Sequence, residues 1–162
     1  IMVTTSESLA NAVSDEVERQ LKLLPRESIA RPAIENNSYI AVMDSVEDMF
    51  TVMNEVAPEH LEIQLPDPMN YMSLVQNAGS VFLGAYASEP LGDYLGGTNH
   101  VLPTSGTARF SSPLGVYDFV KRTSFTQFTK ERLEEVATHI TTLARTEGLE
   151  AHARAIEVRF EK

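Results

Sequence analysis

The chain has 162 residues, enough for one domain or for one domain with an appended arm, and its 43% hydrophobic and 22% charged residues are typical of a folded protein. Thirteen Lys and Arg against 23 Asp and Glu leave a net charge of −10, which argues against binding to nucleic acid or to an anionic membrane surface. The absence of cysteine excludes disulfides, iron–sulfur clusters, cysteine zinc sites and thiol nucleophiles.

Residues 1–5 do not have the pattern of a signal peptide. Residues 1–5 lack a basic region and a long apolar run, and no stretch of 18 apolar residues occurs in the sequence. Together with the lack of cysteine, this leads us to expect a cytoplasmic protein. Residues 1–5 have instead the pattern of the end of a β-strand, so we expect the chain to be cut from a longer polypeptide.

Strand and helix patterns alternate in the first half of the chain. Apolar residues at helical spacing predict helices over 6–24, 27–35, 46–56 and 71–76, the first and third capped by Ser6 and Ser45. Compact or alternating apolar runs predict strands over 1–5, 39–43, 60–65 and 80–83. This alternation is typical of an α/β fold with a mostly parallel sheet flanked by helices, which binds ligands beyond the carboxyl ends of its strands.

The pattern changes after Gly84. Residues 85–116 hold five of the eight glycines and three of the eight prolines, and a loop of this length is usually functional. Helical spacing returns from Thr129, is broken at Gly148, and resumes from 149 to 160.

Candidate chemistry starts with the pair Glu59 and His60, because the common nucleotide-binding, hydrolase and metalloprotease motifs are absent. The pair lies at a predicted helix-to-strand junction, where both side chains can reach one cleft. An imidazole acts as a general base at neutral pH, and a buried carboxylate can do the same. A capping glutamate beside a packed histidine is an equal alternative.

Asp93 and His100 stand in the glycine-rich stretch 92–100, where close backbone approach to a ligand is possible. They offer an oxygen and a nitrogen suited to Zn²⁺, although a plain turn explains the stretch somewhat better on spacing alone. Glu147 and His152 near the C-terminus have, by themselves, the pattern of a solvated helix face.

Taken together, the motifs resemble histidinol dehydrogenase over essentially the whole chain, most densely from 57 to 122. The matching segments, in the family's order, are Ala57-Pro58-Glu59-His60-Leu61-Glu62-Ile63, Asn77-Ala78-Gly79-Ser80-Val81-Phe82-Leu83-Gly84, Gly92-Asp93-Tyr94, Thr98-Asn99-His100-Val101-Leu102-Pro103-Thr104, Ala108-Arg109-Phe110-Ser111-Ser112-Pro113-Leu114-Gly115, Asp118-Phe119-Val120-Lys121-Arg122 and 147–152.

The resemblance implies an enzyme that oxidises L-histidinol to L-histidine through histidinaldehyde, with two NAD and one zinc per site, as an intertwined homodimer. It places residues 1–118 in the second half of an incomplete Rossmann-like α/β domain. Residues 119–162 become a C-terminal helical arm used in dimerisation, which completes the site of the neighbouring subunit. The NAD-binding domain lies outside this chain.

Residue roles also follow from the resemblance. Glu59 and His60 correspond to the acid–base pair, with His60 taking the hydroxyl proton and Glu59 activating water to hydrate the aldehyde. Asp93 and His152 correspond to zinc ligands, the latter donated by the partner subunit. The expected substrate contacts are His60, Asp93, His100, Glu147 and His152.

The family's other two zinc ligands, a Gln and a His in a QAEHG-like segment, precede the point where this sequence starts. Catalytic zinc usually has three protein ligands, so we expect the isolated chain neither to reduce NAD⁺ nor to retain stoichiometric zinc. We also expect it to self-associate through exposed apolar surface and an open strand edge. Two alternatives stay open: a non-enzymatic α/β dimerisation module derived from the enzyme, and a small zinc hydrolase using Asp93, His100 and His152.

Overall fold

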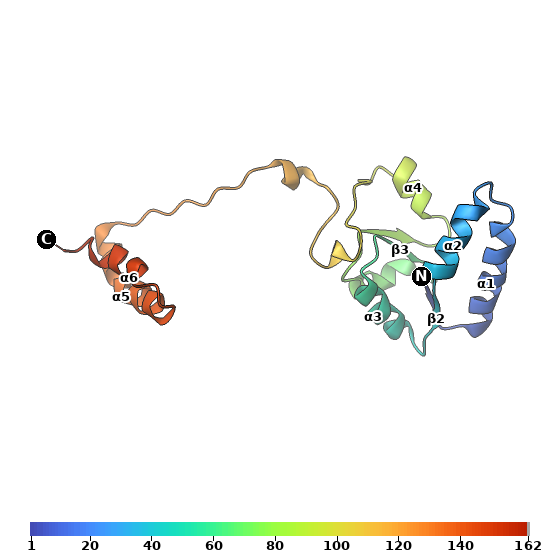
Figure 1. Cartoon of the computed structure of the whole chain (residues 1–162), viewed down its shortest axis with the longest axis horizontal. Coiled ribbons are helices and arrows are strands. Elements are labelled where there is room, and N and C mark those ends of the chain that lie inside the picture. Colours follow the sequence, from blue (N-terminus) through green and yellow to red (C-terminus); the bar gives the residue numbers. More distant parts are fainter. Residues whose placement is uncertain (162) are drawn as a thin grey trace. The chain divides into compact units, whose positions relative to one another are not determined.

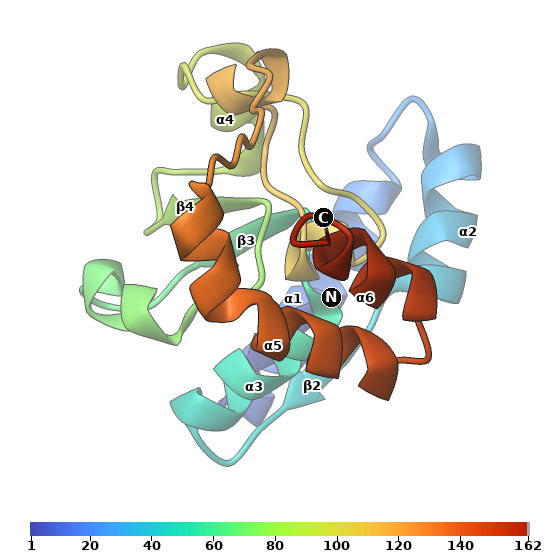
Figure 2. The same cartoon turned by 90° about the vertical axis from the view of Figure 1, so that its left-hand side faces the viewer.

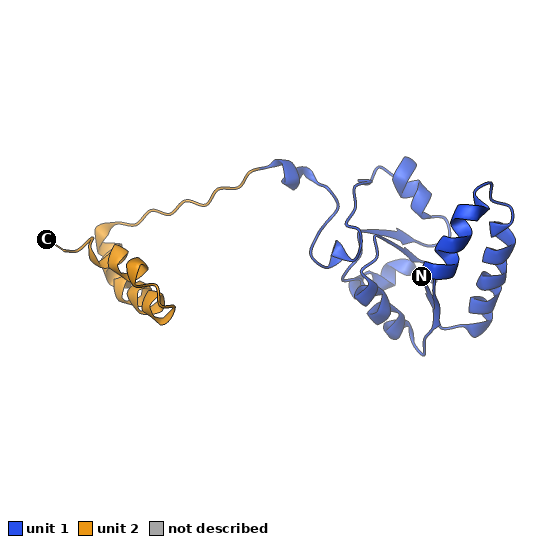
Figure 3. Ribbon diagram, viewed as in Figure 1, with its two compact units in different colours: residues 1–120 blue, residues 121–162 orange. Residues whose placement is uncertain are grey.

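A computed structural model describes residues 1–161 of the chain, and these residues form two compact units, 1–120 and 121–161 (Figure 3). The first unit holds all the described strands, and the second is built on two helices (Figure 1). No helix among residues 1–161 is long and apolar enough to cross a membrane. The expected boundary between 118 and 119 stays a prediction.

The strands of the first unit are parallel, as their alternation with helices predicts. Strand β1 (Met2–Thr4) pairs with β2 (Ile40–Val42), and β3 (His60–Ile63) pairs with β4 (Ser80–Leu83). The pairs form two separate two-stranded sheets within the described residues, where the sequence predicts one. The α/β class with flanking helices and terminal helices is confirmed.

The helices between the strands begin where polar caps were expected. Helix α1 (Glu7–Leu21) starts at Ser6, whose hydroxyl accepts the N–H of Leu9 at 3.2 Å. Helix α3 (Val46–Val56) starts at Ser45, whose hydroxyl accepts the N–H of Asp48 at 3.1 Å. The other helical segments are α2 (Glu27–Asn37), α4 (Glu89–Tyr94) and three 3-10 helices, η1 (Pro68–Leu74), η2 (Thr107–Arg109) and η3 (Val116–Phe119).

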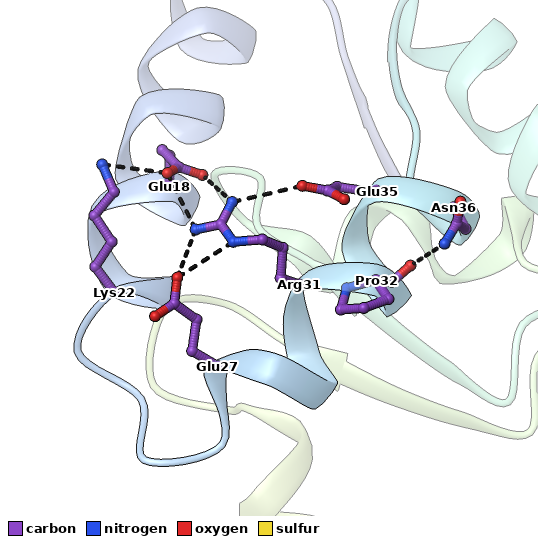
Figure 4. A network of polar contacts seen from close by, with 7 residues as sticks. All are labelled: Glu18, Lys22, Glu27, Arg31, Pro32, Glu35 and Asn36. Atoms are coloured by element: carbon purple, nitrogen blue, oxygen red, sulfur yellow. Dashed lines mark hydrogen bonds and ion pairs between the residues drawn. The ribbon is translucent and has the colours of Figure 1, made fainter.

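Helix α2 buries none of its residues, and ion pairs connect it to α1 instead (Figure 4). The half-buried guanidinium of Arg31 contacts Glu18 of α1 at 2.9 Å. It also contacts Glu27 at 2.8 Å and Glu35 at 3.6 Å within α2. Lys22 adds a contact with Glu18 at 3.2 Å. A network of several charges around one Arg holds better than isolated surface pairs do.

The main core lies between α3 and one face of the β3–β4 sheet. It is formed by Phe50, Leu61 and Ile63, with Val81 and Leu83 of β4 packed against it. Leu61 and Ile63 alternate with polar residues, so their burial confirms the predicted strand periodicity. Because successive side chains point to opposite faces, the other face of β3 is left to His60 and Glu62.

The second unit is a pair of helices, α5 (Lys130–Thr146) and α6 (Glu150–Glu157), seen side by side in Figure 2. Gly148 connects them with a positive φ of 74°. The side chains buried in this unit are small, Thr141, Ala144 and Ala153. Arg145 of α5 joins the helices through Glu150 at 2.8 Å and Glu157 at 2.9 Å.

The contacts of Arg145 predict that acid weakens the α5–α6 pair. Hydrogen bonds from Arg145 lower the pKa of both Glu150 and Glu157, so this contribution is present above the ordinary glutamate pKa. It is lost as the pH falls through the lowered values. We expect the NMR amide signals of α6 to report opening in that range. Arg145→Gln should increase the open fraction of α6 already at neutral pH, and acid-insensitive signals in the unsubstituted chain would contradict this account.

Candidate functional site

The junction between α3 and β3 positions Glu59 and His60. Helix α3 ends at Ala57, which is fully buried with a φ of 50°, and the chain then turns into β3. The N–H of Ser80 donates to the carbonyl of Glu59 at 2.8 Å. Both candidate residues are half-buried, and the neighbouring strand fixes their backbone.

The face of β3 that carries His60 is also the face that carries Phe82. In the parallel register, His60 stands opposite Ser80 and Glu62 stands opposite Phe82. The imidazole of His60 and the ring of Phe82 have their centroids 6.0 Å apart. This face lies opposite the apolar core, and it is the one available for a site.

Helix α4 covers this face and corrects the expectation of an irregular loop after Gly84. The carboxylate of Glu62 accepts the N–H of Glu89 at 3.0 Å, which fixes the start of α4 to β3. A Cβ on Gly92 would lie 2.7 Å from the ring of Phe82, so the absence of a side chain lets the helix approach.

Three side chains from these elements converge. His60, Glu89 and Asp93 each offer a ligand atom, and these atoms all lie within 4.8 Å of one another. The imidazole Nε2 of His60 is 3.9 Å from Oε1 of Glu89. Beyond them, Nδ1 of His100 lies 2.8 Å from Oδ1 of Asp93, a hydrogen bond. Asp93 is the most enclosed of this group, with a side chain 19% exposed.

The charges of these side chains affect one another. The hydrogen bond to His100 lowers the pKa of Asp93, and the same bond raises the pKa of His100. The charge of Glu59 adds to the rise at His100, so this carboxylate lies within electrostatic reach. A hydrogen bond with Asp93 raises the pKa of Glu89. The group presents anionic oxygens and imidazole nitrogens, which suit a divalent metal or a polar substrate.

Two predicted site residues belong to the second unit. Glu147 caps the C-terminal end of α5, and His152 lies in α6, both of them exposed. The structure therefore brings together Glu59, His60, Asp93 and His100 within the first unit. The roles of all six predicted site residues stay predictions.

Sequence reasoning missed Glu89, which lies between two predicted site residues. A signal was present: a Ser before it and a Pro after it mark a helix start. In a helix, Glu89 and Asp93 are four residues apart and share a face. Glu62 was also missed as the residue that anchors α4.

The family model of histidinol dehydrogenase matches residues 1–160. The chain belongs to the histidinol dehydrogenase family. A histidinol dehydrogenase of Lactiplantibacillus plantarum is 66% identical over 161 residues, which cover 99% of this chain and 38% of the relative. One from Streptococcus mutans is 59% identical over 162 residues, which cover 100% of this chain and 38% of the relative.

A solved structure agrees with these relatives. The crystal structure of histidinol dehydrogenase from Elizabethkingia anophelis has a TM-score of 0.76 and 40% identity, covering 98% of this chain and 36% of that one. The resemblance read from the sequence motifs is thereby confirmed at the level of the family. The chain spans little more than a third of the length of the histidinol dehydrogenases it matches.

The close approach of the two strands at the site predicts that Gly79→Ala is destabilising. A Cβ at this position would lie 2.6 Å from the carbonyl oxygen of Glu59, and backbone atoms must shift to relieve the contact. We expect a loss of about 1–3 kcal/mol in the free energy of unfolding, measured with urea. Gly115→Ala is the matched control, since a Cβ there meets nothing nearer than 3.9 Å. Equal stability of both variants would contradict the contact.

Proposed function

We propose that this chain supplies the acid–base pair and part of the metal site of an enzyme that oxidises L-histidinol to L-histidine through histidinaldehyde, with two NAD. The observation that carries the proposal is the convergence of Asp93 and His100 on the face of β3 that presents His60. These residues come from separate elements, and each matches a family motif. Membership of the family supports the same reaction.

His60 takes the proton of the substrate hydroxyl. An alcohol is a very weak acid, so its oxidation needs a base placed on that proton, and imidazole accepts it near neutral pH. The side chain of His60 is 27% exposed, which leaves it accessible to a substrate. The carboxyl group of Glu89, 3.9 Å from Nε2, stabilises the imidazolium that results.

Glu59 serves the second oxidation. Its carboxylate takes a proton from a water molecule as the water oxygen adds to the aldehyde carbon, and return of that proton to the aldehyde oxygen gives the hydrate that is oxidised to the acid. The junction with β4 holds its backbone by the bond from Ser80. Neighbouring positions at the start of β3 thus serve the two steps in turn.

Asp93 fits the proposed zinc in its chemistry, since it is an enclosed carboxylate oriented by His100 and lies beside further oxygen and nitrogen donors. In a dimer, Asp93 would hold the ion together with His152 of a second copy, with two further ligands from outside this chain. Bound zinc would supply polarisation and orientation of the substrate, and NAD would supply the hydride acceptor. His100 and Glu147 of a second copy would contact the substrate.

The isolated chain is expected to be inactive because it covers 38% of its relatives and carries two of the four proposed ligands. Incubation with L-histidinol, NAD⁺ and Zn²⁺ should give no NADH absorbance. Elemental analysis after dialysis should find well under one zinc per chain. Turnover, or one tightly held zinc per chain, would contradict this division of the site.

The two roles predict a split between the half-reactions in a full-length enzyme that carries this segment. His60→Asn should slow oxidation of histidinol by about 10²–10⁴-fold. Glu59→Gln should slow oxidation of histidinaldehyde by a similar factor and affect the alcohol step less. Stopped-flow measurement of NADH with each substrate separates the two. His139→Asn, an exposed histidine of α5, is the control and should change neither rate. Equal losses in both steps for both variants would refute the assignment.

A further inference from the structure

The last turn of α3, directly before the candidate acid–base pair, is where segments from distant parts of the chain are attached. The last carbonyl groups of an α-helix have no partner within the helix. In α3 the carbonyl of Asn54 accepts a hydrogen bond from the side chain of Asn77 at 3.0 Å. The carbonyl of Glu55 accepts one from the guanidinium of Arg109, 54 positions further along the chain. Two separate segments therefore meet at the end of this helix.

The side chain of Asn54 holds the first of these segments, residues 74–77, which lead into β4. Its Nδ2 donates to the carbonyl of Leu74 at 2.8 Å. Its Oδ1 accepts the N–H groups of Gln76 at 2.8 Å and of Asn77 at 3.2 Å. Asn54 and Asn77 are both half-buried, so removal of one partner leaves polar groups that water satisfies poorly. One side chain thus fixes four consecutive residues on α3.

This segment enters β4 beside the candidate acid–base pair. The N–H of Gly79 donates to the carbonyl of Pro58 at 2.9 Å, and the N–H of Ser80 donates to the carbonyl of Glu59 at 2.8 Å. Only two residues separate these donors from the bonds of Asn54, which leaves little slack between them. A movement of the segment on α3 is therefore passed to the backbone of Glu59 and of the start of β3.

Arg109 attaches the loop that carries His100 to the same helix end. Its guanidinium also donates to the carbonyl of Gly106 at 2.9 Å, so one planar group joins the turn at η2 to α3. A cation is also favourable at the C-terminal end of a helix. At the base of the loop, the side chain of Asn99 donates to the carbonyl of Leu114 at 2.5 Å. These two attachments restrict the path of the loop and hence the place of His100.

We infer that Asn54 and Arg109 are positioning residues for the oxidation of histidinol, an assignment that rests on the proposed function. Asn54 holds the acid–base pair through the entry of β4, and Arg109 holds His100 through its loop. Both side chains bind backbone groups of the segments that they hold. They therefore act through those segments and not on the substrate itself.

The role of Asn54 is tested in a full-length histidinol dehydrogenase that carries this segment. Asn54→Ala should lower kcat for histidinol by about 10- to 100-fold and change KM little, because a displaced base fails mainly in the transition state. Ser45→Ala is the matched control, since it removes a side-chain bond at the other end of the same helix. Both variants are assayed at a temperature at which urea unfolding shows them to be folded, and Ser45→Ala should keep its kcat.

Arg109 should give the opposite division between the two kinetic constants. Because His100 is proposed to contact the substrate, Arg109→Gln should raise KM for histidinol by roughly three- to tenfold and change kcat less. Arg26→Gln is the control, because Arg26 is an exposed arginine that precedes α2, and it should change neither constant.

Hydrogen exchange in the same enzyme provides a measurement that does not depend on activity. The amides of Gly79 and Ser80 should exchange faster in Asn54→Ala than in Ser45→Ala. If Asn54→Ala does not fold, Asn77→Ala removes only the side-chain bond to the carbonyl of Asn54 and should show the same changes at smaller size.

Equal kcat in the folded Asn54 and Ser45 variants would overturn the role of Asn54, as would unchanged exchange at Gly79 and Ser80. An unchanged KM in Arg109→Gln would overturn the role of Arg109. Failure of the unsubstituted enzyme to oxidise histidinol would instead refute the proposed function, and the exchange measurement would still report whether Asn54 holds the start of β4.

Discussion

The parallel pairing of β3 with β4 is the constraint on which the candidate site depends. One face of this pair carries Leu61 and Ile63, and burial of these residues against α3 fixes which way the strand faces. A shift of one residue would turn His60 into the core and expose Leu61. The hydrophobic core therefore determines the orientation of the face that carries the candidate site, although no core residue belongs to that site.

On the other face of the β3–β4 sheet, polar and steric contacts position helix α4. A helix of six residues is too short to be stable by itself. The carboxylate of Glu62 satisfies its first N–H group, and Gly92 lets it rest on Phe82. The contact with Glu62 of β3 and the lack of a side chain at Gly92 therefore position Glu89 and Asp93 more than helix propensity does.

Features that depend on neighbouring residues could be predicted from the sequence, whereas features that depend on distant contacts could not. Ser6 and Ser45 were predictable as caps because capping is local, and the Leu61–Ile63 alternation was predictable because strand periodicity is local. Helix α4 had only the local start signal of a Ser and a Pro around Glu89, and it was missed because its stability comes from contacts between residues 27 positions apart in sequence. The hydrogen bond between His100 and Asp93 depends on the path of the loop between them. The spacing of the two residues therefore indicated them as candidates but did not predict their contact. Glu89 was missed for the same reason as its helix.

The electrostatics of the site connect these parts. Glu59, Glu62, Glu89 and Asp93 gather around two histidines in a chain whose net charge is already −10. Like charges at such distances are unfavourable unless cations or protons are shared among them. The pKa of Glu89 is raised and the pKa of Asp93 is lowered, so that Glu89 holds a proton more readily than Asp93 does. An arrangement of this kind is costly as pure scaffold, because apolar residues would pack as well without the repulsion. The group is therefore better understood as part of the candidate site than as part of the scaffold of the first unit.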